Sequence, residues 1–296
     1  PLSIEKQTIK NLGARRITKM GLSYAATKIK PRRINNLEDF YINRFGRELY
    51  ETFFKEYTEK VWGVPCSAIA ADWGSQRVQG LSVSRAVMDA VKKTFSRSTI
   101  VDISQKKTEK SLIEYFLYPK LGPGHMWETV AKHITKRGGT VHTHQAITRL
   151  YVANNVIKAV DVVNTKTGEK TKVKGDYFFS TMPINELVAS LHNTPVPKTI
   201  QRIAAGLPFR DFITVCLLVK RLRVPGSRAK TVRDNWIYIQ EPGIVAGRLQ
   251  IFNNWSPHLV RDKSTVWIGV EYFVNEGDEM WQKGDKKMAK FAAAEL

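Results

Sequence analysis

The run from residue 118 to residue 139 places the strongest constraint on the fold, because it joins a Gly- and Pro-rich loop, a helix and a strand. Gly122 and Gly124 remove the side chains that would keep a flat ligand away from the loop backbone. Val130 and Ile134 then recur at helical spacing until two glycines end the helix. A helix N-terminus offers free N–H groups to an anion or a ring edge. A plain strand-to-helix turn without a ligand explains the pattern equally well at this point.

The length of 296 residues is sufficient for one large or two ordinary domains. No stretch of about 18 apolar residues occurs, so we expect no membrane-spanning helix. The N-terminus has no apolar signal core, and we therefore expect a cytoplasmic protein. Cys66 and Cys216 form neither a CxxC pattern nor a metal-ligand pattern, so we expect two free thiols and no metal.

The net charge of +20 is concentrated in two blocks. Residues 1–33 and residues 197–233 each contain nine Lys or Arg and one acid. Neither block interleaves basic and aromatic residues as nucleic-acid-binding surfaces do, so we do not expect a nucleic-acid partner. Peripheral association with a membrane surface, or steering of an anionic substrate, accounts for the charge at least as well.

The pattern of periodicities predicts a mixed α/β chain with three regions. Residues 1–112 are mainly helical, with a helix over 36–60 that Gly46 interrupts, a second helix over 82–95 and a polar loop over 98–112. Residues 113–194 hold the Gly-rich loop, its helix and a β-meander, whereas residues 195–296 form an antiparallel sheet and a final helix over 277–294. The predicted strands are 140–143, 146–153, 156–164, 170–173, 177–179, 211–220, 235–240, 247–252 and 265–273.

Several short motifs, taken in order, resemble one family. They are Phe40–Gly46, Lys60–Pro65 with Arg77 downstream, Tyr118–Gly124, Ser180–Pro183, and Asn235–Tyr238 before Asn253–Pro257. Together they are similar to the bacterial flavin-dependent oxidoreductases related to UDP-galactopyranose mutase, protoporphyrinogen oxidase and the amine oxidases. The resemblance extends from about residue 36 to about residue 285.

This resemblance implies an FAD-binding α/β domain with a β-meander, and a substrate domain of helices and antiparallel sheet. It places the loop and the following helix beside the flavin ring, one meander residue at the adenine, and a strand end beside the dinucleotide. The implied cofactor-binding residues are Tyr118, Leu121, Gly122, Pro123, Gly124, Met126, Trp127, Ile147, Ser180, Thr181 and Met182.

The substrate implied by the mutase branch is a nucleotide sugar, whose diphosphate would seek arginines and whose uracil would stack on aromatic rings. His125 is the candidate catalytic residue, since it lies beside the implied flavin and can donate a proton. The candidate substrate-binding residues are Arg77, Trp236, Tyr238, Arg248, Trp255 and Tyr272. Ordinary packing in the sheet is the alternative for each of these aromatic residues.

No GxGxxG fingerprint between a strand and a helix occurs in the chain. We therefore expect an internal fragment of a longer flavoprotein, in which the missing fingerprint would bind the pyrophosphate. A non-catalytic basic binding module and an inactive structural fragment are the two alternatives. The sequence does not give the oligomeric state.

Overall fold

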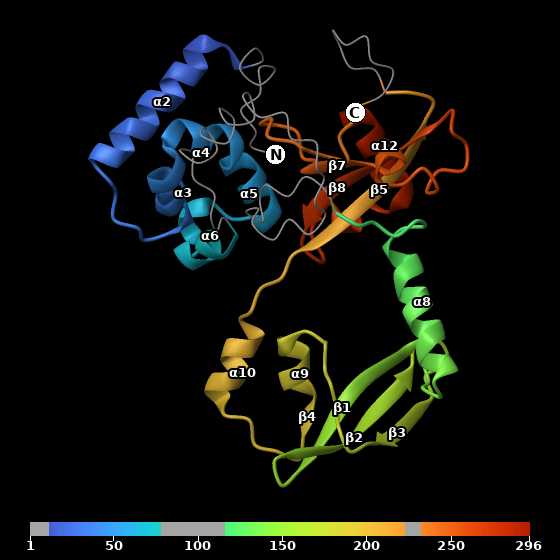
Figure 1. The fold of residues 1–296 in the computed structure, drawn as a ribbon. Coiled ribbons are helices and arrows are strands. Elements are labelled where there is room, and N and C mark those ends of the chain that lie inside the picture. Colours follow the sequence, from blue (N-terminus) through green and yellow to red (C-terminus); the bar gives the residue numbers. More distant parts are fainter. Residues whose placement is uncertain (1–11, 78–115, 223–231) are drawn as a thin grey trace. The chain divides into compact units, whose positions relative to one another are not determined.

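The computed structural model describes residues 12–77, 116–222 and 232–296. The predicted helix over 82–95 and the predicted loop over 98–112 therefore lie outside the described residues. The chain divides into two units, one made of residues 1–125 and 210–296 and the other of residues 126–209. We describe each unit by itself (Figure 1). The predicted three-part division at residues 112 and 194 stays a prediction.

The first unit begins with short helices that share an aromatic core. They are α2 (Ala14–Ile29), α3 (Leu37–Phe45), α4 (Arg47–Phe53), α5 (Lys55–Trp62), the 3-10 turn η1 (Cys66–Ala68) and α6 (Ala71–Arg77). Asn36 caps α3, because its side-chain oxygen accepts a hydrogen bond from the backbone N–H of Asp39 at 2.9 Å. Gly46 ends α3 with φ of 83°, and a Cβ there would meet the backbone N of Tyr24 at 2.8 Å. The predicted helix over 36–60 is thus confirmed, with the predicted break at Gly46 and a second break at Phe54.

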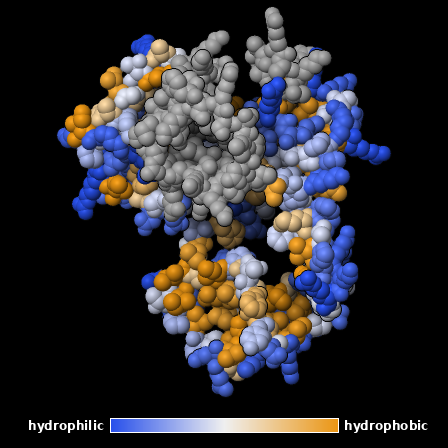
Figure 2. Space-filling model, viewed as in Figure 1, coloured by the Kyte–Doolittle hydropathy of each residue, from blue (hydrophilic) through white to orange (hydrophobic). Residues whose placement is uncertain are grey.

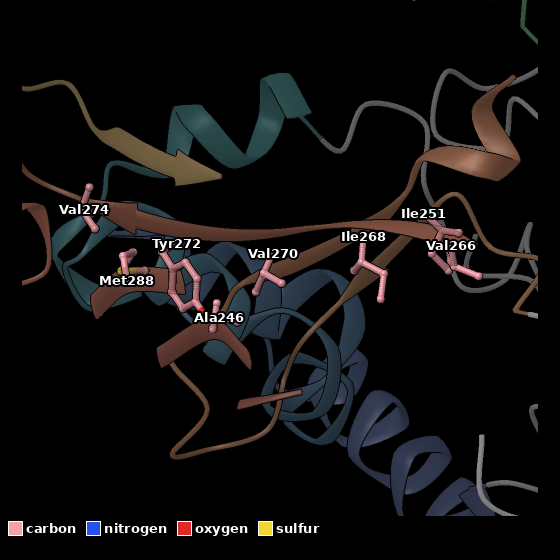
Figure 3. Packing of buried hydrophobic residues seen from close by; sticks show 9 residues of the cluster. Ala246, Ile251, Val266, Ile268, Val270, Tyr272, Val274 and Met288 are labelled. Carbon is pink, nitrogen blue, oxygen red and sulfur yellow. The ribbon is translucent and has the colours of Figure 1, made fainter. Parts of the chain in front are cut away.

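The same unit contains a four-stranded antiparallel sheet. Its spatial order is β5 (Asp211–Val219), β8 (Val266–Val274), β7 (Arg248–Ile251) and β6 (Trp236–Tyr238). The short helix α11 (Phe252–Trp255) follows β7, and η3 (Trp281–Lys283) precedes α12 (Asp285–Glu295). Apolar side chains on one face of the sheet pack against α12 and form the largest buried cluster (Figure 3). Its members are Ala246, Ile251, Val266, Ile268, Val270, Tyr272, Val274, Met288 and Ala292.

Polar side chains connect the helices of the first unit to its sheet. Arg210 donates from Nε to the carbonyl oxygen of Val61 at 3.1 Å and from Nη2 to that of Phe273 at 2.8 Å. Lys60 donates to the carbonyl oxygen of Ile239 at 3.1 Å and to that of Glu241 at 3.0 Å. Both cations therefore connect α5 to the region of the sheet through backbone carbonyl oxygens.

The second unit contains the predicted meander. Its sheet has the order β3 (Lys170–Lys174), β2 (Val156–Asn164), β1 (Gln145–Ala153) and β4 (Leu191–His192), with β4 parallel to β1. Asn154 and Asn155 connect β1 to β2 with φ of 53° and 58°, which is the two-residue turn that this dipeptide favours. The helices are α8 (Pro123–Lys136), whose first residues belong to the first unit, α9 (Ile184–Ser190) and α10 (Lys198–Ala205).

The mixed α/β class is confirmed, but some predicted elements are wrong. Residues 140–143 and 177–179 form no strand, because neither segment has a ladder partner among the residues that the structure describes. The final helix begins only at Asp285, because Asp278 accepts hydrogen bonds from the backbone N–H groups of Asn275 and Trp281 and holds a turn before it. The sequence also favours a short helix over 23–29, and in the structure this helix is longer, since α2 begins at Ala14 and ends at Ile29.

Candidate functional site

One face of the antiparallel sheet carries polar and aromatic side chains, opposite the face that packs against α12. Side chains alternate along a strand, and directly paired residues share a face. The register pairs Glu271 of β8 with Arg248 of β7, and Arg248 with Tyr238 of β6. It likewise pairs Gln250 with Trp236. We call this surface, defined by these five residues, the polar face.

An ion pair lies at the centre of the polar face. Arg248 donates from Nε to Oε2 of Glu271 at 2.5 Å, and its Nη2 contacts the same oxygen. Gln250 donates to the other carboxylate oxygen. The Glu271 side chain is fully buried, whereas 21% of the Arg248 side chain is exposed. The carboxylate therefore has a donor on each oxygen, and the Arg248 side chain stays partly exposed.

Aromatic rings join the start of the Gly-rich loop to the polar face. The guanidinium of Arg248 lies over the Trp236 ring, 4.6 Å from its centroid. Trp236 meets Trp255 edge to face at 4.8 Å, and Tyr118 stacks on Trp255 with ring centroids 5.1 Å apart. Next to this stack, Ser256 donates to the carbonyl oxygen of Lys120 at 2.7 Å. Two contacts thus hold the loop against the sheet.

Trp255, on which the loop stacks, has a buried polar atom without a partner among the described residues. The indole N–H of Trp255 is buried and has no hydrogen-bond acceptor within the described part of the chain. A buried donor without an acceptor is costly, so such a group points to an acceptor supplied by a ligand or a water. The nearby Gly122 is buried and has φ of 87°, and a Cβ there would approach Leu259 at 3.3 Å. The backbone of the loop is therefore closely packed where it passes the aromatic cluster.

Tyr57 of α5 borders the polar face on the side of Tyr238. The two rings meet edge to face with centroids 4.7 Å apart. Burial raises the pKa of Tyr57 to about 12, although the neighbouring Arg248 guanidinium acts in the opposite direction. The hydroxyl therefore stays protonated at neutral pH and is available as a donor beside Arg248.

The structure brings four of the predicted site residues into one cluster. These residues are Tyr118, Trp236, Arg248 and Trp255, and Tyr238 joins them on the polar face. Tyr272 does not, because it is fully buried on the opposite face, where its ring packs against Phe291 at 5.7 Å.

The other predicted residues of the first unit lie nearer the helices. Arg77 is the last residue of α6. His125 is half-buried in the first turn of α8, and Leu121, Pro123 and Gly124 are exposed just before it. These positions stay predicted site residues.

The remaining predicted cofactor residues belong to the second unit. Met126 and Trp127 are exposed on α8, and Ile147 lies on β1. Residues 180–182 lie in the irregular segment that leads into α9. Their predicted contact with the cofactor stays a prediction.

The second unit carries an unusual amount of exposed apolar surface. Tyr177 and Phe179 are 86% and 95% exposed, and helix α8 has no buried residue. Figure 2 shows hydrophobic side chains gathered over the region of α9, α10 and the sheet. The exposed members include Val130, Ile134, Val141, Ile147, Ile184, Ile200, Ile203 and Leu207. Exposed apolar surface of this extent is typical of interaction sites.

The sequence analysis missed three residues of the site: Tyr57, Gln250 and Glu271. A signal for Glu271 exists, since it is the one charged residue in the apolar run of β8. A charge in such a run is buried only when it has a partner. The partner depends on strand register, which the sequence does not show.

The described residues contain no group of three or more His, Cys, Asp or Glu side chains that could hold a metal ion. Within the same residues, every helix is too short or too polar to cross a membrane.

Comparison with solved structures identifies the fold. A reduced UDP-galactopyranose mutase superimposes with a TM-score of 0.68 at 16% identity, covering 96% of this chain and 58% of the mutase. The chain has the fold of that mutase over almost its whole length. No family model matches the sequence.

Two further structures agree with this assignment. An oxidoreductase from Methanosarcina mazei gives a TM-score of 0.60 at 10% identity. The match covers 99% of this chain and 60% of the oxidoreductase. A protein named as a candidate protoporphyrinogen oxidase from Exiguobacterium sp. 255-15 gives a TM-score of 0.57 at 11% identity. The match covers 94% of this chain and 55% of that protein. The resemblance inferred from the motifs is thereby confirmed at the level of the fold. The chain spans 55–60% of the length of these three proteins.

Proposed function

We propose that the chain is part of a flavin-dependent oxidoreductase or nucleotide-sugar mutase, in which the flavin ring lies against the loop of residues 118–127. The observation that carries this proposal is the stacking of Tyr118 on Trp255, since it joins the Gly-rich loop to the sheet face that bears Arg248. An anionic substrate at Arg248 would then be bound near the part of the loop that belongs to the same unit, residues 118–125.

The residues present fit the ring of FAD better than its pyrophosphate. Trp255 offers a buried N–H that has no acceptor among the described residues, and the exposed Gly124 has no side chain to obstruct a flat ring. No Gly-rich phosphate cradle accompanies them in the sequence. We assign the pyrophosphate to a part of the full-length protein outside these 296 residues.

Unpaired segments of the second unit support this assignment. Residues 140–143 and 177–179 have strand-like sequences but no ladder partner in the described part of the chain, and the apolar side chains of Tyr177 and Phe179 are exposed. A parallel strand from the rest of the protein would satisfy both segments. FAD, when bound, would supply the electron chemistry, and the protein would supply binding and orientation.

Arg248 is the residue that we assign to the substrate phosphates. Its guanidinium is oriented by Glu271 and by the Trp236 ring, while the side chain stays partly exposed. The protonated Tyr57 hydroxyl can donate to the same anion, and the ring of Tyr238 can stack on a nucleobase. His125 is the residue that we assign to hold or move a proton beside the ring.

The cofactor assignment is tested by expressing the full-length protein with excess riboflavin. We expect a yellow protein that releases FAD on denaturation, and a full-length protein that never retains flavin would exclude the proposal. Trp255→Phe keeps an aromatic ring but removes the unpaired N–H, and we expect weaker FAD retention with little change in the free energy of unfolding.

The substrate assignment is tested separately by calorimetric titration of the full-length protein with UDP and with uridine. Arg248→Ala should abolish the preference for UDP over uridine, because the guanidinium would no longer meet the diphosphate. Arg261→Ala, at an exposed arginine of the same unit, is the matched control and should leave the preference intact. An unchanged preference in Arg248→Ala would remove Arg248 from the substrate site without affecting the flavin assignment.

A further inference from the structure

Helix α2 exposes an apolar seam that the proposed flavoenzyme function does not use. Met20 is buried on one side of the helix, which packs along α3 and α4 (Figure 1). Thr18, Leu22, Ala25 and Ile29 form a seam on the other side, at the spacing i, i+4, i+7 and i+11. Leu22 is 67% exposed and Ile29 is 86% exposed. The helix therefore has two apolar faces. One packs on the core of the unit, and the other is directed away from it.

Basic residues are frequent in α2 and in the segment that follows it. Residues 14–36 contain seven Lys or Arg and no acid: Arg15, Arg16, Lys19, Lys28, Lys30, Arg32 and Arg33. Four of them bond within the chain, for example Lys19 with Glu48 at 2.7 Å. The side chains of Arg15, Lys30 and Arg33 have no hydrogen bond or ion pair with any other residue that the structure describes.

The segment after the helix is held in place beside the seam. The side chain of Asn43 accepts a hydrogen bond from the backbone N–H of Arg32 at 2.8 Å and donates to the Arg32 carbonyl oxygen at 2.6 Å. Lys30 caps the helix through its backbone N–H to Ala26 at 3.0 Å. These contacts keep the cations of residues 30–33 directly beyond Ile29, at the end of the seam.

We infer that α2 and residues 30–33 form a docking surface for the anionic headgroups of a lipid membrane. An aliphatic seam with a cationic border matches a bilayer interface, where apolar side chains enter the acyl boundary and Lys or Arg pair with lipid phosphates. Nucleic acid fits this surface less well, because it offers no apolar phase for Leu22 and Ile29. Single-stranded nucleic acid also binds by stacking its bases on aromatic side chains, and the seam has no aromatic residue.

The inference is tested by co-sedimentation of the 296-residue chain with vesicles of phosphatidylcholine alone and with added phosphatidylglycerol. We expect binding only to the anionic vesicles, weakening as salt is raised. The triple variant R15E/K30E/R33E should lower the partition coefficient by roughly fivefold or more for each reversed charge. The seam variant L22Q/I29Q should bind less than the wild type at both low and high salt.

The matched control reverses three exposed lysines of the second unit: K158E/K166E/K170E. Both triple variants change the net charge equally, so equal losses of binding would show a non-specific charge effect and overturn the inference.

Binding to a model RNA that is unaffected by L22Q/I29Q, together with no vesicle binding, would assign the surface to nucleic acid instead. A wild-type dimer that L22Q/I29Q dissociates, without vesicle binding, would assign the seam to a second copy of the chain. Flavin retention does not enter either measurement, so the result is independent of the proposed function.

Discussion

Arg248 and Glu271 face each other across strands β7 and β8 and form an ion pair whose carboxylate is fully buried. The residues flanking Glu271, Val270 and Tyr272, belong to the hydrophobic core on the other face of the same strand. One strand of nine residues thus forms both the core and the centre of the candidate site.

Glu271→Ala should strongly destabilise the protein. Removing the carboxylate leaves the half-buried Arg248 guanidinium without its partner, and breaking a buried pair in this way costs about 3–5 kcal/mol. Urea denaturation measures the loss as a change in the free energy of unfolding. The double variant R248M/E271Q removes the charges from both positions and should be less destabilised than the sum of its single variants. Additive losses would show that the two side chains are not coupled.

Gly122→Ala should cost roughly 1–2 kcal/mol, because an L-residue is strained at the positive φ of 87° found there. The new Cβ would also approach Leu259 at 3.3 Å. Gly124→Ala is the matched control, since no atom lies within 4 Å of its Cβ position. Its free energy of unfolding should stay within about 0.5 kcal/mol of the wild type. Equal effects of the two substitutions would contradict the loop geometry.

Tyr118→Ala should release the Gly-rich loop from the sheet. An aromatic pair contributes about 0.5–1.5 kcal/mol beyond the buried area, and this contribution is lost with the ring. Limited proteolysis should show faster cleavage around residues 118–122 in this variant. Tyr118→Phe retains the ring that stacks on Trp255 and should be cleaved at the wild-type rate. Faster cleavage of the Phe variant would mean that the hydroxyl, and not the stacking, anchors the loop.

Tyr57→Phe should change how stability depends on alkaline pH. Burial raises the pKa of Tyr57 from 10.0 to about 12, so the folded protein holds the phenol proton more tightly than the unfolded chain does. The resulting stability is fully present below pH 10 and is lost as the pH rises to about 12. The wild type should therefore lose more free energy of unfolding over this range than the Phe variant. Other buried tyrosines titrate in both proteins, and identical pH profiles would contradict the burial of Tyr57.

Cys216 should react with maleimide at neutral pH, whereas Cys66 should not. Cys66 is buried, and burial raises its pKa to about 11, which leaves little thiolate. Cys216 is exposed on β5. Mass spectrometry should show a single label on the folded chain and two after unfolding. The variant Cys216→Ser should remain unlabelled until it unfolds.

Local sequence signals predict most of the helices and strands. Asn36 and Gly46 delimit α3, the Asn154–Asn155 turn joins β1 to β2, and alternation identifies the strands of the larger sheet. Residues 140–143 and 177–179 have the composition of strands but form none. A strand needs a hydrogen-bonding neighbour, and composition does not show whether one is available.

The candidate site is predictable only in part for a related reason. Trp236 and Arg248 belong to one cluster as the motifs imply, but Tyr272 lies on the opposite face and Glu271 takes its place. Alternation places residues 271 and 272 on opposite faces. Both side chains are fully buried, and which of them enters the apolar cluster depends on the face of the sheet against which α12 packs.

The neighbours Glu271 and Tyr272 have a consequence for how the sheet assembles. A slip of β8 by one residue against β7 would direct the carboxylate into the apolar cluster beneath α12 and bring the tyrosine out of it. Such a sheet would hold an unpaired charge among aliphatic side chains, so misaligned pairings are penalised while the chain folds. The carboxylate that orients Arg248 therefore also disfavours pairings in which β7 and β8 are shifted against each other.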